Sequence, residues 1–325
     1  MTALNRQAWS ELSSTEKEAV MQDLASKLPQ GFQFQGLQTF QRYGVTNETG
    51  IFTYKEAEFV FVPGNQVTLG WESWDQGMDE ATREDLLETL GEYDIEDADQ
   101  YLRDQMSPVR EAAIGAMLVE RAARSAGWQQ VPLQDLPLLD EPEIEEELTK
   151  FRASTYSKYE QYQHFRLVRQ EEDIRLFLFN EDLTWEQAVA DVHNEGFSLL
   201  TEEEWEYIYG GGCRTLFPWG DSFDYKMKVK HFEELVEEDD SREYDLSLPN
   251  AFGLLFDGDP YQYEWTIREG ELMPKGGDGG SLICGGSGLV VGYLPVAAYF
   301  RDSYFEELDW EEIMGHLWYR RIVRL

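Results

Sequence analysis

The sequence predicts an α+β fold in which the C-terminal part has little regular secondary structure and the N-terminus carries a helical extension. Three observations support this class. Short apolar runs such as Phe59–Val62 and Ile174–Phe179 have the length and composition of β-strands. Capping boxes at Ser13 and Thr201, each followed three residues later by glutamate, predict the starts of helices. Beyond Gly210 the chain is rich in glycine, aspartate and aromatic residues, which favours loops joined by short strands.

The composition indicates a globular protein rather than a disordered chain. With 325 residues, 42% of them hydrophobic and 14% aromatic, the chain has enough apolar material for one large domain or two modest ones. Its formal net charge of −37 disfavours DNA or RNA as a partner, because binding to phosphate backbones needs Lys and Arg to displace counterions. We interpret the acidity as a surface kept soluble by charge repulsion.

Cysteine content and the N-terminal residues predict a cytoplasmic location. The cysteines, Cys213 and Cys284, are too few for a disulfide framework or a four-cysteine zinc site, which indicates reduced thiols. Met1–Lys27 lacks the charged-then-apolar pattern of a secretion signal, and no apolar run approaches the roughly 20 residues that a membrane span requires. We therefore expect no membrane partner.

Residues 1–55 are predicted to form an N-terminal extension packed on a main domain of residues 56–325. The helix that follows Ser13 carries apolar residues at helical spacing until Pro29 and Gly31 end it. Because an apolar stripe requires a packing surface, we expect the extension to dock on the main domain rather than to form a free tail.

Strands and helices follow at the start of the main domain. Apolar runs at Phe59–Val62 and Val67–Gly70, separated by a Pro-Gly pair, predict a β-hairpin. Leucines at helical intervals within Met78–Gln105 predict one or two solvent-facing helices. The acidic, proline-rich stretch at about 132–150 has no consistent period and predicts a surface linker or insertion.

Two strands and two capped helices are predicted in the next segment. Arg166–Arg169 and Ile174–Phe179 have strand composition, and Thr184–Asn194 and Thr201–Tyr209 have helical start signals. Trp205 falls on the inward face of the second helix. We expect Trp205 and Trp219 to contribute to the core rather than to contact a ligand.

Four segments, in the same order along the chain, are similar to the motifs of one known family. They are Phe59–Gly64 with Leu69–Gly70; Leu183–Ala188 with Leu199–Tyr207 and Gly210–Asp221; Pro249–Leu254 with Glu264–Thr266; and Gly279–Ser281 with Arg301 and Tyr319–Arg320. Together, from Glu58 to Leu325, they resemble the formylglycine-generating enzyme (sulfatase-modifying factor) family. The resemblance implies a C-type-lectin-like fold for the main domain.

The resemblance also bears on copper. Copper-dependent members bind the metal with two cysteines near the last Gly-Gly-Ser motif; here Cys284 stands at the first of these positions and Leu289 at the second. Because copper(I) is a soft ion that prefers two thiolates, the resemblance implies that this chain does not use copper. Cys213 would replace the second ligand only if the Gly210–Gly212 loop approached Cys284. An alternative alignment matches Lys275–Asp278 to the motif and leaves Cys284 without a counterpart.

Two interpretations of Cys284 remain open. It is the candidate catalytic residue if it acts as a residual nucleophile or metal ligand. Otherwise it is a small buried hydrophobe in a glycine-rich turn. The second interpretation is favoured because no Lys, Arg or His lies beside Cys284 in the sequence to lower the pKa of its thiol.

A candidate calcium site lies further upstream. Asp257, Asp259 and Glu264 supply the hard oxygen ligands that calcium prefers, although aspartate with glycine and proline is equally the composition of a turn. We therefore expect either calcium or no cofactor. The histidines are expected at the surface rather than at an iron site: His164, His193, His231 and His316.

The glycine-rich C-terminal loops predict a binding cleft with Asp278, Ser281, Tyr299 and Arg301 on its surface. The leading hypothesis is a non-copper, catalytically degenerate member of the resembled family that binds a peptide or a small molecule in this cleft. The competing hypothesis is an oxidoreductase or other metal-dependent enzyme on the same scaffold, using Cys284 or a divalent metal held by the three acidic residues. A purely structural partner of an enzyme is the third.

Overall fold

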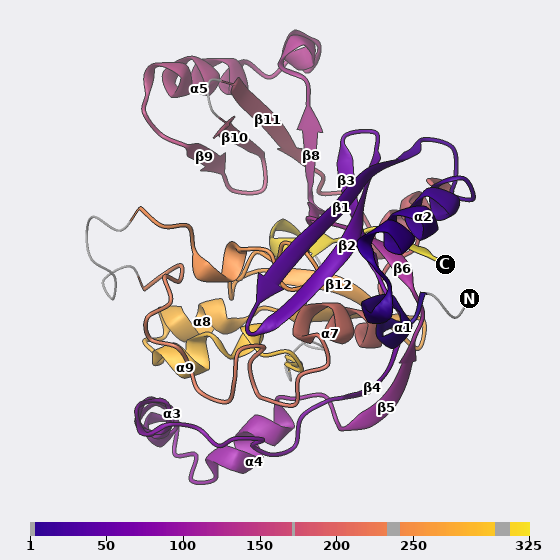
Figure 1. Cartoon of the computed structure of the whole chain (residues 1–325). Helices are drawn as coiled ribbons and strands as arrows, with labels where there is room; N and C mark the ends of the chain where they lie inside the picture. Colours follow the sequence, from indigo (N-terminus) through magenta and orange to yellow (C-terminus); the bar gives the residue numbers. More distant parts are fainter. Residues whose placement is uncertain (1–3, 171–172, 233–240, 303–312) are drawn as a thin grey trace. The chain divides into compact units, whose positions relative to one another are not determined.

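The computed structural model of the chain describes residues 4–170, 173–232, 241–302 and 313–325 (Figure 1). It combines helices with several antiparallel sheets, so the predicted α+β class is confirmed. The chain divides into two compact units: the first consists of Met1–Arg124, Val189–Glu307 and Trp318–Leu325, and the second of Ser125–Ala188 and Leu308–Leu317. Within the described ranges, no helix has both the length and the apolar composition that crossing a membrane requires.

A five-stranded antiparallel sheet in the first unit joins strands from both ends of the chain. Its strands, in spatial order, are β1 (Phe32–Arg42), β2 (Val45–Tyr54), β3 (Ala57–Val62), β6 (Met117–Glu120) and β15 (Ile322–Arg324). The hairpin of β1 and β2 can be followed in Figure 1. The predicted boundary after Lys55 falls in the turn between β2 and β3, so the N-terminal extension contributes two strands to the sheet.

Two N-terminal helices precede this sheet, α1 (Arg6–Glu11) and α2 (Ser14–Ala25). The capping box predicted for Ser13 and Glu16 is confirmed, because each side chain accepts a hydrogen bond from the backbone N–H of the other residue. α2 packs on β1 and β2 and buries Met21 completely. Burial of one such side chain stabilises the fold by about 1.5–3 kcal/mol.

The predicted hairpin after residue 58 is wrong, although both of its strand segments exist. β4 (Asn65–Leu69) pairs with β5 (Arg110–Ile114), whereas β3 pairs with β2 and β6. The backbone of Gly64 instead forms hydrogen bonds with Leu4 and Arg6. The apolar pattern predicts that a segment is a strand, but it does not encode which distant strand becomes the partner.

The remaining helices of this region match the prediction of one or two helices before residue 105. They are α3 (Glu80–Glu92) and α4 (Ala98–Asp104). Leu86, Leu90 and Leu102 are buried, so the leucine pattern marks the faces that pack on the core.

Beyond Gly210 the elements are short: Asp245–Ser247, β12 (Tyr263–Arg268), β13 (Glu271–Gly276), α8 (Gly279–Cys284), α9 (Leu289–Gly292), Leu294–Val296 and Met314–His316.

The helix α7 (Glu202–Gly210) carries most of the candidate site. Thr201 and Glu204 form the predicted capping box, with distances of 3.2 Å from Glu204 N to Thr201 Oγ1 and 2.8 Å from Thr201 N to Glu204 Oε2. Trp205 is buried, so its predicted inward position is confirmed. The helix ends at Gly211, whose φ of 66° lies in the left-handed region that favours glycine.

The second unit has its own sheet and its own core. The sheet order is β8 (Trp128–Val131), β11 (Asp173–Phe179), β10 (Phe165–Gln170) and β9 (Lys158–Gln161), and it contains both strands predicted for this segment. The core residues are Leu136, Ile144, Leu148, Phe151, Phe165, Leu167 and Leu176. The predicted helix at 184–194 is present as α6 (Trp185–Asn194). Two short strands, β7 (Arg124–Ser125) and β14 (Leu317–Tyr319), lie where the chain passes from one unit to the other.

Residues 132–150 are helical rather than an irregular linker. Leu133–Leu138 forms a 3-10 helix and Pro142–Ala153 forms α5. Pro142 is compatible with a helix because it stands in the first turn, where a backbone N–H needs no intrahelical acceptor. Ile144 and Phe151 are buried on one face of α5, whereas the many glutamates occupy the remaining positions.

Candidate functional site

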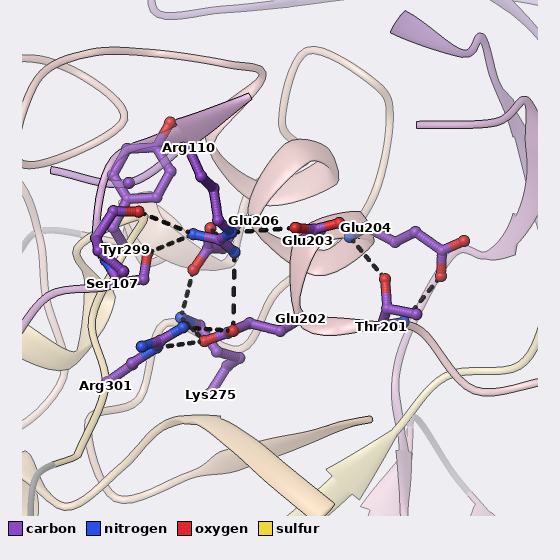
Figure 2. Close-up of polar contacts among 12 residues, drawn as sticks. Ser107, Arg110, Thr201, Glu202, Glu203, Glu204, Glu206, Lys275, Tyr299 and Arg301 are labelled. Atoms are coloured by element: carbon purple, nitrogen blue, oxygen red, sulfur yellow. Dashed lines mark hydrogen bonds and ion pairs between the residues drawn. The ribbon is translucent and has the colours of Figure 1, made fainter. Parts of the chain in front are cut away.

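Buried ion pairs connect α7 to three other segments of the first unit. Glu202 and Glu206 are one helical turn apart and both are buried. Arg301 binds Glu202 through two contacts of 2.7 Å, and Lys275 Nζ lies 3.0 Å from Glu206 Oε1. Arg110, from β5, completes the network with Nη2 3.0 Å from Glu206 Oε2 (Figure 2). These contacts hold α7, β5, β13 and the chain at residue 301 together.

The network is balanced in charge, which explains how it tolerates burial. Glu203 adds a third carboxylate, 3.1 Å from Arg110 Nε, so three acids face three bases. Burial raises the pKa of Glu202, but hydrogen bonds from Arg301 and the charges of Lys275 and Arg110 outweigh burial and lower the pKa to about 2. Glu202 is therefore an anion at neutral pH.

A second buried ion pair joins two of the segments that carry the family resemblance. Arg320, with no exposed side-chain surface, donates to Glu264 over distances of 2.5 and 3.0 Å. It also donates to the backbone carbonyls of Glu120, Arg121 and Leu255 at 3.0 to 3.2 Å. Its guanidinium lies 4.3 Å from the centroid of Phe256. One arginine thus satisfies a carboxylate and three carbonyl groups in the core.

A cavity of about 280 Å³ lies between α7, the start of β12 and the end of β13. Its walls are mainly apolar and aromatic; they include Trp205, Tyr209, Phe256, Tyr263, Pro295, Val296 and Trp318. The indole of Trp205 stacks on Tyr209 with ring centroids 4.7 Å apart. The polar lining residues are Ser247, Asp257, Asp259, Gln262, Glu264 and Lys275.

The structure brings the three predicted calcium ligands to this cavity, but each already contacts a basic side chain. Lys230 Nζ lies 2.6 Å from Asp257, and His231 Nε2 lies 3.0 Å from Asp259. Glu264 is bound by Arg320, as described above. Among the described residues, no three His, Cys, Asp or Glu side chains form a group able to hold a metal ion. The calcium site therefore stays a prediction, and in this structure the three carboxylates are paired with basic side chains.

Cys284 ends the short helix α8 and is exposed, so the interpretation of a buried hydrophobe is wrong. Its Sγ lies 3.0 Å from the hydroxyl of Tyr261. Cys213 is also a free thiol, and its Sγ contacts the carbonyl of Thr215 at 3.9 Å. Leu289, at the second position of the implied copper pair, is a buried residue of α9.

The four residues predicted for the cleft have different environments. Tyr299 is fully buried, with its hydroxyl donating to the carbonyl of Cys213 at 2.5 Å, so it offers no surface to a ligand. Arg301 is bound to Glu202. Asp278 is half-buried. The pKa of the cavity residue Tyr263 is raised, first by the burial of its own hydroxyl and then by the negative charge of Asp278. Ser281 lies in α8, but its side chain is outside the part of the chain that the structure describes.

Sequence reasoning missed the residues that partner the predicted acids. His231 was expected simply at the surface; it is exposed, yet it also contacts Asp259 and lies with its ring centroid 4.8 Å from that of Tyr261. Lys230 was not singled out at all. No local signal marks these two bases, because they stand far before Asp257 and Asp259 along the chain and meet them only after folding.

The two thiols are expected to differ in reactivity. The pKa of Cys213 is raised to about 11, because the effect of burial is larger than the lowering effect of the hydrogen bonds with Thr215 and Tyr299. Roughly one molecule in a thousand then carries the thiolate at pH 8. We expect iodoacetamide to alkylate Cys284 at least about tenfold faster than Cys213 in the folded protein, because only the thiolate attacks.

Peptide mapping by mass spectrometry at timed intervals measures both rates. In 8 M urea the two cysteines are expected to react at similar rates, and Cys284→Ser leaves only the slow reaction in the folded protein. Equal rates for both thiols under native conditions contradict the prediction.

No family model and no curated protein matches this chain.

Proposed function

We propose that this chain is a binding module for a small molecule or a peptide side chain, on a scaffold of the formylglycine-generating type that does not use copper. The observation that carries the proposal is the aromatic cavity beside α7. Trp205 and Glu264, from two of the similar segments, line this cavity. The charged residues of these segments pair with one another, Glu202 with Arg301 and Glu264 with Arg320.

The similar motifs support a shared scaffold because they are the points where the segments are tied together. The second motif segment is bound to the fourth through Glu202 and Arg301. The third is bound to the fourth through Glu264 and Arg320. The first is bound to the second because the hydroxyl of Tyr207 donates to the carbonyl of Pro63 at 2.9 Å. Such residues are required for the fold whether or not the chain retains catalysis.

The chemistry of the cavity favours an uncharged ring as ligand. Stacked and edge-on aromatic walls supply apolar surface, and the acids at its margin face Lys230, His231 and Arg320. A volume of about 280 Å³ is smaller than most drug-sized pockets, which start near 300 Å³. The cavity therefore suits one ring, either as a small molecule or as an aromatic side chain of a peptide.

Neutral ring compounds test this proposal directly. The probes are indole, phenol and N-acetyltryptophanamide, and binding is measured by saturation-transfer NMR and by isothermal titration. Ala123 lines the cavity, so Ala123→Trp fills it and is expected to weaken binding by at least about tenfold. Ala113→Trp, at an exposed position of β5, is the matched control.

Binding of at least one probe by the wild type, its loss in Ala123→Trp and its retention in Ala113→Trp support the proposal. Failure of the wild type to bind any of the three probes, or equal binding by the two variants, overturns it.

A further inference from the structure

A second cavity, of about 370 Å³, lies at the C-terminal end of α7, and Tyr209 lines both cavities. Hydrogen-bond donors dominate the polar part of its lining: Arg6, Arg42, Arg214, Asn47 and Gln76. Asp75 is the single acidic side chain among the lining residues. The side chains that line this cavity therefore include three guanidinium groups and one carboxylate, in a chain whose net charge is −37.

Two of these arginines have no carboxylate partner among the described residues. Arg6 Nη1 donates to the carbonyl of Gly211 at 2.6 Å, and its guanidinium lies 5.3 Å from the ring centroid of Phe252. Arg214 Nη1 donates to the carbonyl of Gly70 at 2.6 Å. A guanidinium has five N–H groups, so these carbonyl contacts leave donors available to a ligand.

The third arginine and Asn47 add donors at the same cavity. Arg42 Nη2 donates to the backbone carbonyl of Asp245 at 2.5 Å and lies 3.8 Å from its carboxylate, which is a weak ion pair. Asn47 Nδ2 is buried and has no hydrogen-bond acceptor in the described part of the chain. Unsatisfied donors in an electropositive cavity favour an anionic ligand.

The cavity also offers an aromatic surface and an open loop. Trp219 stacks on Phe217 with an interplanar angle of 3° and lies 5.6 Å, centroid to centroid, from Tyr43. Gly211 and Gly212, with φ of 66° and 82°, carry no side chain into the space that they line. A flat ring therefore has a surface on which to pack.

We propose that this second cavity binds a small oxyanion, a carboxylate or a phosphate, attached to an aromatic ring. Arg6 and Arg214 bind the oxyanion, since the planar guanidinium fork matches both groups in geometry. Tyr43 and Trp219 pack against the ring. This site is separate in chemistry from the neutral cavity, because there the acids and bases face one another, whereas here two arginines donate to backbone carbonyls and have no carboxylate partner among the described residues.

Phenyl phosphate, benzoate and inorganic phosphate are the probes, titrated calorimetrically at low ionic strength. We expect Arg6→Met and Arg214→Met each to weaken binding of the ring-bearing anions by about tenfold or more, the usual effect of losing a charge-assisted hydrogen bond. Comparison of phenyl phosphate with benzoate identifies the preferred oxyanion. Comparison of phenyl phosphate with inorganic phosphate measures how much the ring of the ligand contributes to binding. Trp219→Ala is expected to abolish this contribution.

Two further variants keep the test independent of folding. Asp75→Asn removes the carboxylate at the cavity and is expected to tighten binding about threefold, an effect that an unfolded protein does not produce. Arg83→Met makes the same charge change as the arginine variants at an exposed position of α3 outside the cavity, and is expected to leave binding unchanged. Equal losses in Arg83→Met and Arg214→Met, no tightening in Asp75→Asn, or no binding by the wild type overturns the proposal.

Discussion

Arg320→Met is expected to lower the free energy of unfolding by about 3–5 kcal/mol, the largest loss expected for any side chain described above. The substitution leaves the buried Glu264 carboxylate without its cation and leaves the carbonyls of Glu120, Arg121 and Leu255 without a donor. Both effects carry a desolvation cost that the native arginine offsets. Urea unfolding, followed by tryptophan fluorescence and by circular dichroism, measures the loss.

A double substitution separates the unpaired charge from the lost packing. Arg320→Met combined with Glu264→Leu removes both charges, so it is expected to be more stable than the single variant, although still below the wild type because the three carbonyls remain unsatisfied. Arg83→Met, at an exposed position, is the control and is expected to stay within about 0.5 kcal/mol of the wild type. A loss below about 1 kcal/mol in Arg320→Met contradicts the framework role assigned to this ion pair.

Local signals in the sequence predicted the helices α2 and α7. The capping boxes at Ser13 and Thr201 are recognisable because the two partners of each box lie within one helical turn of one another. The strand pairing was not predictable in the same way: β3 finds its partner β6 much further along the chain, and nothing in the Pro-Gly pair after Val62 indicates this. The helix α5 is hard to recognise from the sequence because prolines and glutamates are also typical of loops, although Pro142 occupies a position that helices accept.

The candidate site was predictable only in part, for the same reason. The sequence marks Asp257, Asp259 and Glu264 as hard oxygen donors or turn residues, and all three line one cavity. Their partners Lys230, His231 and Arg320 could not be predicted, because these bases come from distant parts of the chain. The sequence likewise contains no signal for the second cavity, since its arginines are widely separated along the chain and meet only when it is folded.

Glu202→Gln is expected to lower the free energy of unfolding by about 3 kcal/mol at pH 7, and this difference is expected to depend strongly on pH. The pKa of Glu202 is about 2 in the folded protein against 4.5 ordinarily, and each unit of such a shift corresponds to about 1.4 kcal/mol. Because the folded pKa is lowered, the stabilisation is fully present above pH 4.5 and is lost as the pH falls towards 2. Somewhat less than half of the difference is expected to remain at pH 3.

Urea unfolding of both proteins at intervals between pH 7 and pH 2 gives the difference curve. Glu203→Gln is the matched control, since Glu203 lies on the same helix and also contacts Arg110, but 45% of its side chain is exposed. Exposed ion pairs contribute at most about 1 kcal/mol, so the control difference is expected to be small at every pH. If the Glu202→Gln difference stays constant from pH 7 to pH 2, the hydrogen bonds from Arg301 and the charges of Lys275 and Arg110 do not hold the Glu202 carboxylate ionised. The ion network would then contribute packing and shape to the scaffold, and its stability would not depend on the charge of Glu202.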